Sequence, residues 1–397
     1  MQATNRIDMV DALRGYALLG LFIVHCVERF EVYWLSPTPD PWFDAVFALF
    51  AGKAFAIFAL LFGFSFATIM ANERARGGDF TWRFAWRLLL LLAIGTVHVM
   101  FYRGDVLQVL AVVGLLMIPF DRVRSDRVLL ALAALAFLQV PLWVRWWAAG
   151  QGADWALAAP LYTTWGDLQK LADGTALAVA LDNLGPGTVG KWSYYLETGR
   201  VMEIAGLFLI GMVIHRRRLF ADAADKRGLW LAVAGVSAAA WLLAVWIEGS
   251  VGPSEAQKQT AEWLVGQARN LPAMAFQVAV FVLLWSTPVR RLQALLVPAG
   301  KMTLTLYVGQ SVVGVALLYG WGLGLWDDVS NAEVVIAGLV AFAVQLVLAA
   351  WWFRHFRYGP LEWLWRAART SCTAKATRPA ITTSAFETSS HRPRPQP

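Results

Sequence analysis

Long apolar stretches alternate with short polar segments along most of the chain. Within each stretch the apolar residues are nearly continuous and do not alternate with polar ones, which excludes membrane-crossing strands. About 20 such residues in a helix cross the roughly 30 Å hydrocarbon core of a bilayer. The pattern predicts an all-α integral membrane protein, a helical bundle of about ten transmembrane helices, at 12–31, 43–71, 83–102, 105–121, 127–147, 200–215, 228–247, 269–287, 300–320 and 332–353.

The predicted helices form two halves around one long connection. Residues 148–199 are expected to face outward and, at that length, to be functional or flexible, so they could cover an outward-facing site. The span 43–71 is long enough to bend at Gly52. The C-terminal tail is rich in Ser, Thr, Pro and Arg and is predicted to be disordered. The expected organisation is a five-helix half with the polar motifs, an extracytoplasmic loop, a second five-helix half and a cytoplasmic tail, at 1–147, 148–199, 200–370 and 371–397.

Composition supports a lipid environment. Hydrophobic residues make up 58% of the chain and charged residues 15%, against about 45–50% and about 25% in soluble proteins. The 21 Trp residues fit a bilayer protein, because Trp is enriched at both headgroup interfaces. The formal charge of +7 comes from short basic clusters between apolar stretches, so it does not indicate nucleic-acid binding. Membrane lipids are the expected partners, and a homodimer is left open.

The basic residues also predict an orientation, because cytoplasmic loops retain Lys and Arg. The N-terminal stretch lacks a small-residue cleavage site, so the first helix is expected to be retained as a span. The basic clusters fall on alternate connections, which places both termini in the cytoplasm. The residues on that side are Arg74, Arg76, Arg83, Arg87, Arg122, Arg124, Arg127, Arg216, Arg217, Arg218, Lys226, Arg227, Arg290, Arg291 and Lys301.

The first predicted helix has a polar stripe. Arg14 and His25 differ by only about 20° around a helix axis and by about 16 Å along it. Asp11 and Glu28 fall within about 60° of the same line. Arg14 is suited to phosphate or carboxylate, and His25 exchanges a proton near neutral pH. The alternatives are that Arg14 is a positive-inside anchor paired with Asp11 and that His25 is an interhelix hydrogen-bonding contact.

Further polar residues lie in other apolar stretches, where an ionisable group indicates function. Lys53 is expected near the midplane of the second span, although its ammonium could also reach the surface. His98, Asp105 and Gln108 lie at depths compatible with His25, and Asp105 could equally cap the fourth helix. Additional buried candidates are Glu203 and Gln310, whereas Tyr307 is more typical of core packing.

Several classes of site are unsupported by the sequence. No GxxxxGK[ST] phosphate loop and no GxSxG nucleophile motif occurs. His98, His215 and His355 are scattered, and the two Cys residues lie far apart, so no metal site is expected.

Five segments resemble successive motifs of YeiB-like bacterial membrane proteins. They are RIDMVDALRGYALLGLFIVH, AGKAFAIFALLFGFSFA, RGDVLQVLAVVGLLMIPF, GKMTLTLYVGQS and RYGPLEWLWR. The resemblance covers nearly the whole chain outside 148–199 and the tail, and the last two motifs are the most specific. It implies a bacterial inner-membrane location and includes a C-terminal domain of unknown function, but no settled biochemical activity.

The DALRG opening also resembles, more distantly, the first helix of transmembrane acyltransferases. These include heparan glucosaminide N-acetyltransferase and bacterial enzymes that O-acetylate polysaccharides. In the bacterial enzymes an Arg and a His separated by ten residues are required on this helix, and Arg14 and His25 reproduce that spacing. YeiB-like proteins often have Asn at the position of His25, which brings this chain closer to the acyltransferases.

This second resemblance implies acyl transfer from cytoplasmic acetyl-CoA or another acyl-CoA to a hydroxyl or amine outside, such as one on a glycan or lipid-linked acceptor. It implies that Asp11, Arg14 and Gly15 bind the co-substrate. His25 is the expected general base, with His98 and Asp105 as further catalytic candidates, and Lys53 or another buried donor would stabilise the oxyanion. The alternatives are a transporter or flippase and a non-catalytic scaffold or sensor.

Overall fold

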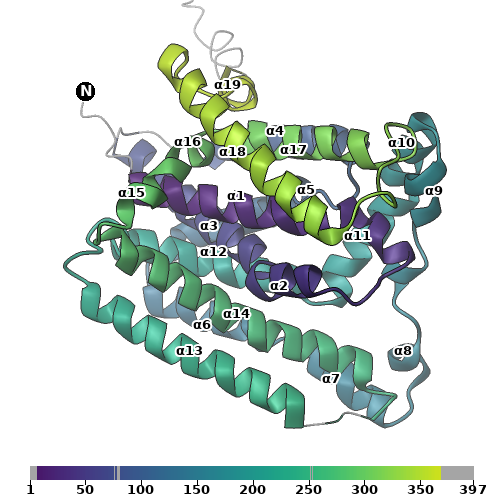
Figure 1. Ribbon diagram of the computed structural model, residues 1–397. Coiled ribbons are helices and arrows are strands. Elements are labelled where there is room, and N and C mark those ends of the chain that lie inside the picture. The colour runs from purple at the N-terminus through teal and green to yellow at the C-terminus, as the bar shows by residue number, and fades with distance from the viewer. Residues whose placement is uncertain (1–6, 76, 78–80, 251, 253, 368–397) are drawn as a thin grey trace, which may run out of the picture.

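A computed structural model describes residues 7–75, 77, 81–250, 252 and 254–367 (Figure 1). Within these ranges every regular element is a helix, and there are no strands. The elements are α1 (Asp8–Val27), η1 (Arg29–Leu35), α2 (Pro41–Leu49), α3 (Lys53–Arg74), α4 (Thr81–Val99), α5 (Leu107–Met117), η2 (Ile118–Arg122), α6 (Asp126–Phe137), α7 (Val140–Gly150), α8 (Asp154–Leu157), η3 (Leu161–Thr163), α9 (Leu168–Asp173), α10 (Ala176–Leu184), α11 (Pro186–Glu197), α12 (Arg200–Arg216), α13 (Arg227–Ser250), α14 (Lys258–Trp285), α15 (Arg290–Gln293), η4 (Ala294–Leu296), α16 (Val297–Lys301), α17 (Thr303–Leu318), α18 (Asn331–His355) and α19 (Pro360–Ala367).

The predicted fold class is confirmed: the chain is an all-helical, multi-pass membrane protein. In the described ranges, seven helical segments are long and apolar enough to cross a membrane, and two bent helix pairs raise the number to nine. The seven are Asp8–Leu35, Pro41–Arg74, Thr81–Val99, Asp126–Gly150, Arg227–Ser250, Lys258–Trp285 and Asn331–His355. The bent pairs are Pro186–Glu197 with Arg200–Arg216 and Arg290–Lys301 with Thr303–Leu318. Nine of the ten predicted spans therefore correspond to one of these segments.

The remaining predicted span, 105–121, is shorter in the structure. Its α-helix, α5, has 11 residues and therefore a length of about 16 Å, roughly half the hydrocarbon thickness. The helix starts only after Asp105, and a 3₁₀ turn containing Pro119 replaces its C-terminal end. The apolar stretch 105–121 is thus longer than the α-helix that it contains.

Two spans contain breaks. The helix is interrupted at Gly52, where a bend was predicted: Gly52 has φ +77° and separates α2 from α3. Gln139, with φ +51°, separates α6 from α7 inside the predicted span 127–147. Its side chain donates to the Gly199 carbonyl at 3.1 Å. A polar contact to a neighbouring helix end accompanies this second break.

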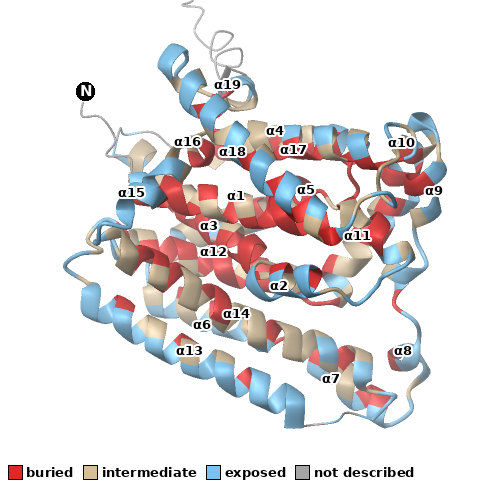
Figure 2. Ribbon diagram, viewed as in Figure 1, coloured by how far each residue is buried: buried red, intermediate tan, exposed pale blue. Residues whose placement is uncertain are grey.

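α1 is the most buried helix of the bundle, and α13 is among the least (Figure 2). Of the apolar window of each segment, 78% is buried for Asp8–Leu35 and 17% for Arg227–Ser250. α1 contacts α3, α16 and α18, and α3 also packs along α12. The polar stripe of α1 therefore lies inside the protein, whereas α13 is left largely exposed at one side.

The segment 148–199 contains short helices, α8 to α11, rather than irregular chain. Asp167 and Thr175 cap α9 and α10 with their side chains, which stabilises such short helices. α11 meets α12 at a bend of 65°. The second half of this segment is therefore continuous with the bundle. The tail 371–397 lies outside the described residues.

Candidate active site

The C-terminal end of α1 brings His25 close to Tyr102. His25 lies in the last turn of α1, and Tyr102 lies in the turn after α4. The Tyr102 hydroxyl is 3.0 Å from Nδ1 of His25. The ring of His98 is 6.2 Å from the Tyr102 ring, on the same aromatic cluster. The two histidines that the sequence placed at similar depth thus share one neighbour.

His98 and Asp105 form a buried pair. Nδ1 of His98 is 2.8 Å from Oδ1 of Asp105, and the two side chains are 1% and 0% exposed. The other Asp105 oxygen accepts from the backbone N–H of Gln108 at 3.1 Å, at the start of α5. Asp105 therefore accepts from the first turn of α5, as expected of a capping carboxylate, and also contacts His98. Nε2 of His98 is buried without a hydrogen-bond partner among the described residues, so a carboxylate orients a ring whose second nitrogen is available.

Gln108 connects this pair to the segment 148–199. Its side-chain carbonyl accepts from Nζ of Lys191 on α11, and its amide donates to Thr96 at 3.1 Å. Tyr307 of α17 accepts from the Val106 backbone N–H at 3.2 Å. The Tyr307 ring also lies 5.3 Å from the His98 ring. Side chains from α4, α5, α11 and α17 therefore converge here.

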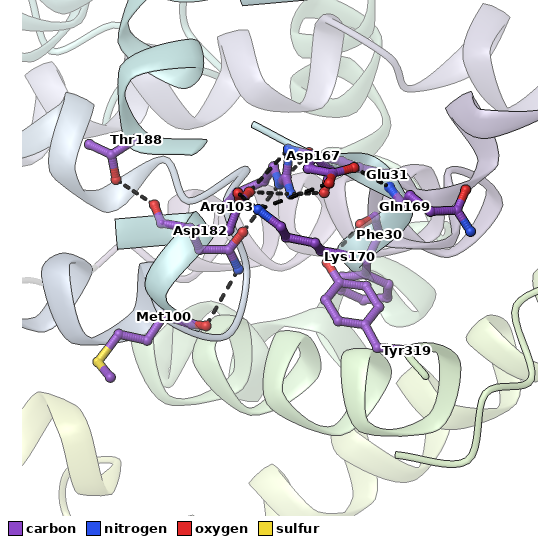
Figure 3. Close-up of polar contacts among 11 residues, drawn as sticks. Phe30, Glu31, Met100, Arg103, Asp167, Gln169, Lys170, Asp182, Thr188 and Tyr319 are labelled. Atoms are coloured by element: carbon purple, nitrogen blue, oxygen red, sulfur yellow. Dashed lines mark hydrogen bonds and ion pairs between the residues drawn. The ribbon is translucent and has the colours of Figure 1, made fainter. Parts of the chain in front are cut away.

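Arg103 lies in an ionic network beside this centre (Figure 3). It donates to Asn183 at 3.2 Å and to Asp182 at 3.3 Å, and its Nε is 3.8 Å from Oε2 of Glu31. The second Asp182 oxygen accepts from Lys170 at 3.0 Å. This hydrogen bond raises the pKa of Lys170, because the carboxylate favours the charged ammonium. The network joins α9 and α10 to the end of α4.

The turn after α1 directs Glu31 toward Arg103. Arg29, Phe30 and Glu31 have φ values of 46°, 50° and 87°, although none is glycine. Such residues cost about 1–3 kcal/mol each and persist where the surroundings over-determine them. The Phe30 carbonyl accepts from Tyr319 at 2.9 Å (Figure 3), and Arg29 donates to the Val329 carbonyl at 2.8 Å. Tertiary contacts therefore hold this strained turn.

The polar residues at the N-terminal end of the stripe on α1 form a separate group. Arg14 donates to Asp11 at 2.7 Å and to Ser65 of α3 at 2.6 Å, so the ion pair between Arg14 and Asp11 is present. Gly15 is a close-packing position, because a Cβ there would overlap the Leu296 carbonyl. The structure thus joins Arg14 to α3 and packs Gly15 against η4.

The remaining candidates lie apart from His25. Lys53 is 3% exposed and donates to the Phe47 carbonyl at 3.1 Å. Glu203 is 4.0 Å from Arg200, and Gln310 donates to Gln345 at 2.7 Å. Among the described residues, Lys53, Glu203 and Gln310 form no hydrogen bond with either His25 or His98. Their predicted roles therefore have no direct contact to support them.

Sequence reasoning missed three residues of this centre, Glu31, Tyr102 and Lys191, and Arg103 entered only as part of the RGDVLQVLAVVGLLMIPF motif. Tyr102 and Arg103 lie three and two residues before Asp105, so the polar YRGD segment was a usable signal. Lys191 lies in a segment that reads as a loop, and only its position on α11 brings it to Gln108. Within the described ranges, no group of three His, Cys, Asp or Glu could hold a metal ion.

Comparison with known proteins divides the chain into two parts. Residues 6–167 match the family described as the catalytic domain of heparan-alpha-glucosaminide N-acetyltransferase. Residues 214–371 match the family described as protein of unknown function DUF418. His25, Tyr102, His98 and Asp105 all fall in the first part.

Three relatives align over nearly their whole length. The uncharacterised protein YxaH of Bacillus subtilis is 27% identical, over 92% of this chain and 94% of its own. An uncharacterised 39.9 kDa protein in the amylase 3' region of Bacillus acidopullulyticus is 26% identical, over 91% and 93%. The uncharacterised protein YeiB of Escherichia coli is 26% identical, over 94% and 97%. The chain therefore combines a domain similar to the heparan-alpha-glucosaminide N-acetyltransferase catalytic domain with a DUF418 domain, and it is a distant homologue of the uncharacterised YeiB and YxaH proteins.

Proposed function

We propose that this protein is a transmembrane acyltransferase that moves an acyl group, acetyl in the simplest case, from cytoplasmic acyl-CoA to a hydroxyl or amine outside. The observation that supports this most is the convergence of His25, Tyr102 and the His98–Asp105 pair within the part that matches an acetyltransferase catalytic domain. A glycan or lipid-linked molecule is the proposed acceptor class.

His25 is the proposed general base. Nδ1 faces the Tyr102 hydroxyl, which leaves Nε2 to take the proton of the acceptor. The acceptor oxygen or nitrogen then attacks the thioester carbonyl carbon, the carbon–sulfur bond breaks, and the proton passes from His25 to the CoA sulfur. His25 is therefore in the same protonation state at the end of the reaction as at its start.

Lys191 is a better proposed oxyanion donor than Lys53. Lys191 contacts Gln108, which follows Asp105 at the start of α5. Lys53 instead donates to the Phe47 carbonyl, away from the histidines. A preorganised donor stabilises the negative charge that develops on the carbonyl oxygen. The His98 ring lies 6.2 Å from the Tyr102 ring, and the His98–Asp105 pair would position Tyr102 or accept a second proton.

The inner group is the proposed entry side for acyl-CoA. Arg14 is about 16 Å from His25 along α1, and the predicted orientation puts Arg14 near the cytoplasm. The co-substrate would lie along this axis, with its phosphates inside and its thioester further out.

Acyl transfer by the purified protein in liposomes tests the proposal. Acetyl-CoA labelled in the acetyl group should release free CoA, and the release should disappear in His25→Ala. His355→Ala is the matched control, because His355 is exposed at the end of α18. If the wild-type protein neither binds acetyl-CoA nor releases CoA above a lipid control, the proposal is wrong.

The bent helices favour transport as a second candidate. α11 meets α12 at 65°, and Arg290–Lys301 meets α17 at 81°. Discontinuous helices next to buried polar groups are typical of transporter substrate sites. Transport predicts solute movement across the liposome membrane without CoA release, so the same preparation distinguishes the two functions.

A further inference from the structure

A cleft of about 410 Å³ lies at the inner ends of α3 and α12, outside the centre described above. Its apolar part includes Ala67 and Ala71, which are four residues apart and so lie on one face of α3. Small side chains at these positions leave space between the two helices. Its polar lining comes from three arginines, one histidine, one asparagine and one aspartate.

The arginines differ in how firmly they are held. Arg216 donates to the carbonyls of Val123 and Asp121, at 2.6 and 3.3 Å, and its side chain is 23% exposed. Arg74 and Arg218 are 61% and 72% exposed. One guanidinium is therefore fixed at the wall by carbonyls, and the two more exposed ones would bind a ligand by exchanging part of their contacts with Asp121 and Asp222.

The balance of charge in the cleft favours an anion. Arg74, Arg216 and Arg218 face a single carboxylate in the lining, Asp121, which Arg74 contacts through both oxygens at 2.7 and 2.9 Å. Two carboxylates outside the lining partly neutralise the other arginines: Asp222 lies 3.2 Å from Arg218, and Asp126 lies 3.8 Å from Arg216. Both helices end here, so their dipoles disfavour an anion, and the arginine side chains would have to hold it.

His215 lies in the same wall. Its Nδ1 is 3.0 Å from the Thr68 hydroxyl, and that hydroxyl donates to the Phe64 carbonyl at 2.8 Å. Because the hydroxyl proton is already used, Nδ1–H donates to Thr68. Nε2 is left for the cleft, where it is an acceptor in the neutral ring and a donor only when the ring is protonated.

We propose that this cleft binds a phosphate group. Guanidinium groups match phosphate oxygens in pairs of parallel hydrogen bonds. The predicted orientation places this end at the cytoplasmic surface, where basic pockets between helices meet phosphate-bearing ligands. Two sources offer this chemistry: the phosphates of CoA, an identification that rests on the proposed function, and the headgroup of an acidic phospholipid.

Binding to the full-length protein in nanodiscs tests this assignment. In phosphatidylcholine nanodiscs, CoA is the probe, and the double variant Arg74→Gln/Arg218→Gln should weaken its binding about tenfold. In a second arm with phosphatidylglycerol, native mass spectrometry measures the lipid retained. Arg124→Gln is the matched control, because it removes a charge from the same end at an exposed position outside the cleft. Asp121→Asn should tighten binding, since it removes the negative charge of the lining.

The outcomes separate the two sources. Weaker CoA binding in the double variant identifies CoA, whereas unchanged CoA binding with less retained phosphatidylglycerol identifies the lipid. If neither measurement differs from Arg124→Gln, the cleft assignment is wrong. Phosphate binding without any acyl transfer would contradict the proposed function and leave the cleft assignment standing. Because both substituted arginines are largely exposed, the unfolding temperature should stay unchanged, which checks the fold.

Discussion

The Tyr102 hydroxyl lies 3.0 Å from Nδ1 of His25 and connects the C-terminal end of α1 to the turn between α4 and α5. The same turn contains Arg103, which contacts Asn183 on α10, and Asp105, which contacts His98 at the end of α4. His25 is also 3.8 Å from Glu28. The imidazole is thus oriented through Nδ1 by a residue outside its own helix.

Tyr102→Phe should lower the rate of acyl transfer about 10-fold or more while His25→Ala lowers it by about 10²–10⁴-fold. The phenyl ring keeps the packing, and only the hydroxyl that orients His25 is lost. Rates of CoA release in liposomes measure both effects. Tyr16→Phe is the control, since it removes a hydroxyl from α1 that contacts Gln277 instead. A wild-type rate in Tyr102→Phe would contradict the orienting role.

Asp105→Asn should separate the two roles of Asp105. Asn caps a helix about as well as Asp, so the unfolding temperature should change little. The loss of the carboxylate leaves His98 without its charged partner, and transfer should fall about 10²-fold. Asp105→Ala should in addition lower the free energy of unfolding by about 1 kcal/mol, because the cap of α5 is lost. Transfer at the wild-type rate in Asp105→Asn would show that the His98–Asp105 pair is structural.

The sequence pattern predicted the helices and the polar stripe of α1 better than it predicted the contacts of that stripe with other helices. Periodicity alone puts Arg14 beside Asp11 and His25 beside Glu28, since each pair is three residues apart on one helix. The partner of His25 is Tyr102, 77 positions away. No periodicity relates residues in different helices, so the contact between His25 and Tyr102 could not be predicted from the pattern.

The strained turn after α1 and the position of α11 also could not be predicted from the sequence pattern. Positive φ values at Arg29, Phe30 and Glu31 are imposed by tertiary contacts, and their side chains have no preference for that conformation. α11 contains Gly187, Gly190 and a buried Lys191, a composition that reads as a loop. Its position in the bundle, and hence the place of Lys191, follows from packing that composition does not encode.

Close packing of α3 against α12 should be sensitive to a single methyl group. A Cβ at Gly63 would overlap the Phe208 carbonyl, and one at Gly211 would overlap the Leu60 carbonyl. Small residues let membrane helices approach this closely. Gly63→Ala should therefore lower the free energy of unfolding by about 1–3 kcal/mol. Tryptophan fluorescence during unfolding in detergent measures the change.

Gly309→Ala is the matched control for this substitution. Gly309 lies inside α17, and nothing surrounds the position of a Cβ there. Alanine is the better helix former by about 1 kcal/mol, so this variant should be as stable as the wild type or more stable. Equal effects of both alanines would mean that α3 and α12 are not in close contact.

Glu362 explains why the last two sequence motifs occur together. It belongs to the GPLEW segment of α19, and its Oε1 accepts from the backbone N–H groups of Leu304 and Thr305 at 2.7 and 3.2 Å. Its Oε2 accepts from the Thr305 hydroxyl at 2.6 Å. These N–H groups are at the start of α17, where a helix has no internal acceptors and where negative charge is favoured. The GPLEW segment therefore caps α17, the helix that contains most of the GKMTLTLYVGQS motif.

Glu362→Ala should lower the free energy of unfolding by about 1–2 kcal/mol, because the first turn of α17 loses its acceptor and α19 loses its anchor. Glu362→Gln should lose less, since an amide oxygen still accepts from Leu304. Glu255→Ala, at an exposed position before α14, controls for the loss of a carboxylate elsewhere. Unfolding in detergent measures all three variants. If Glu362→Ala and Glu255→Ala unfold alike, α19 contributes no cap, and the GPLEW motif needs another explanation.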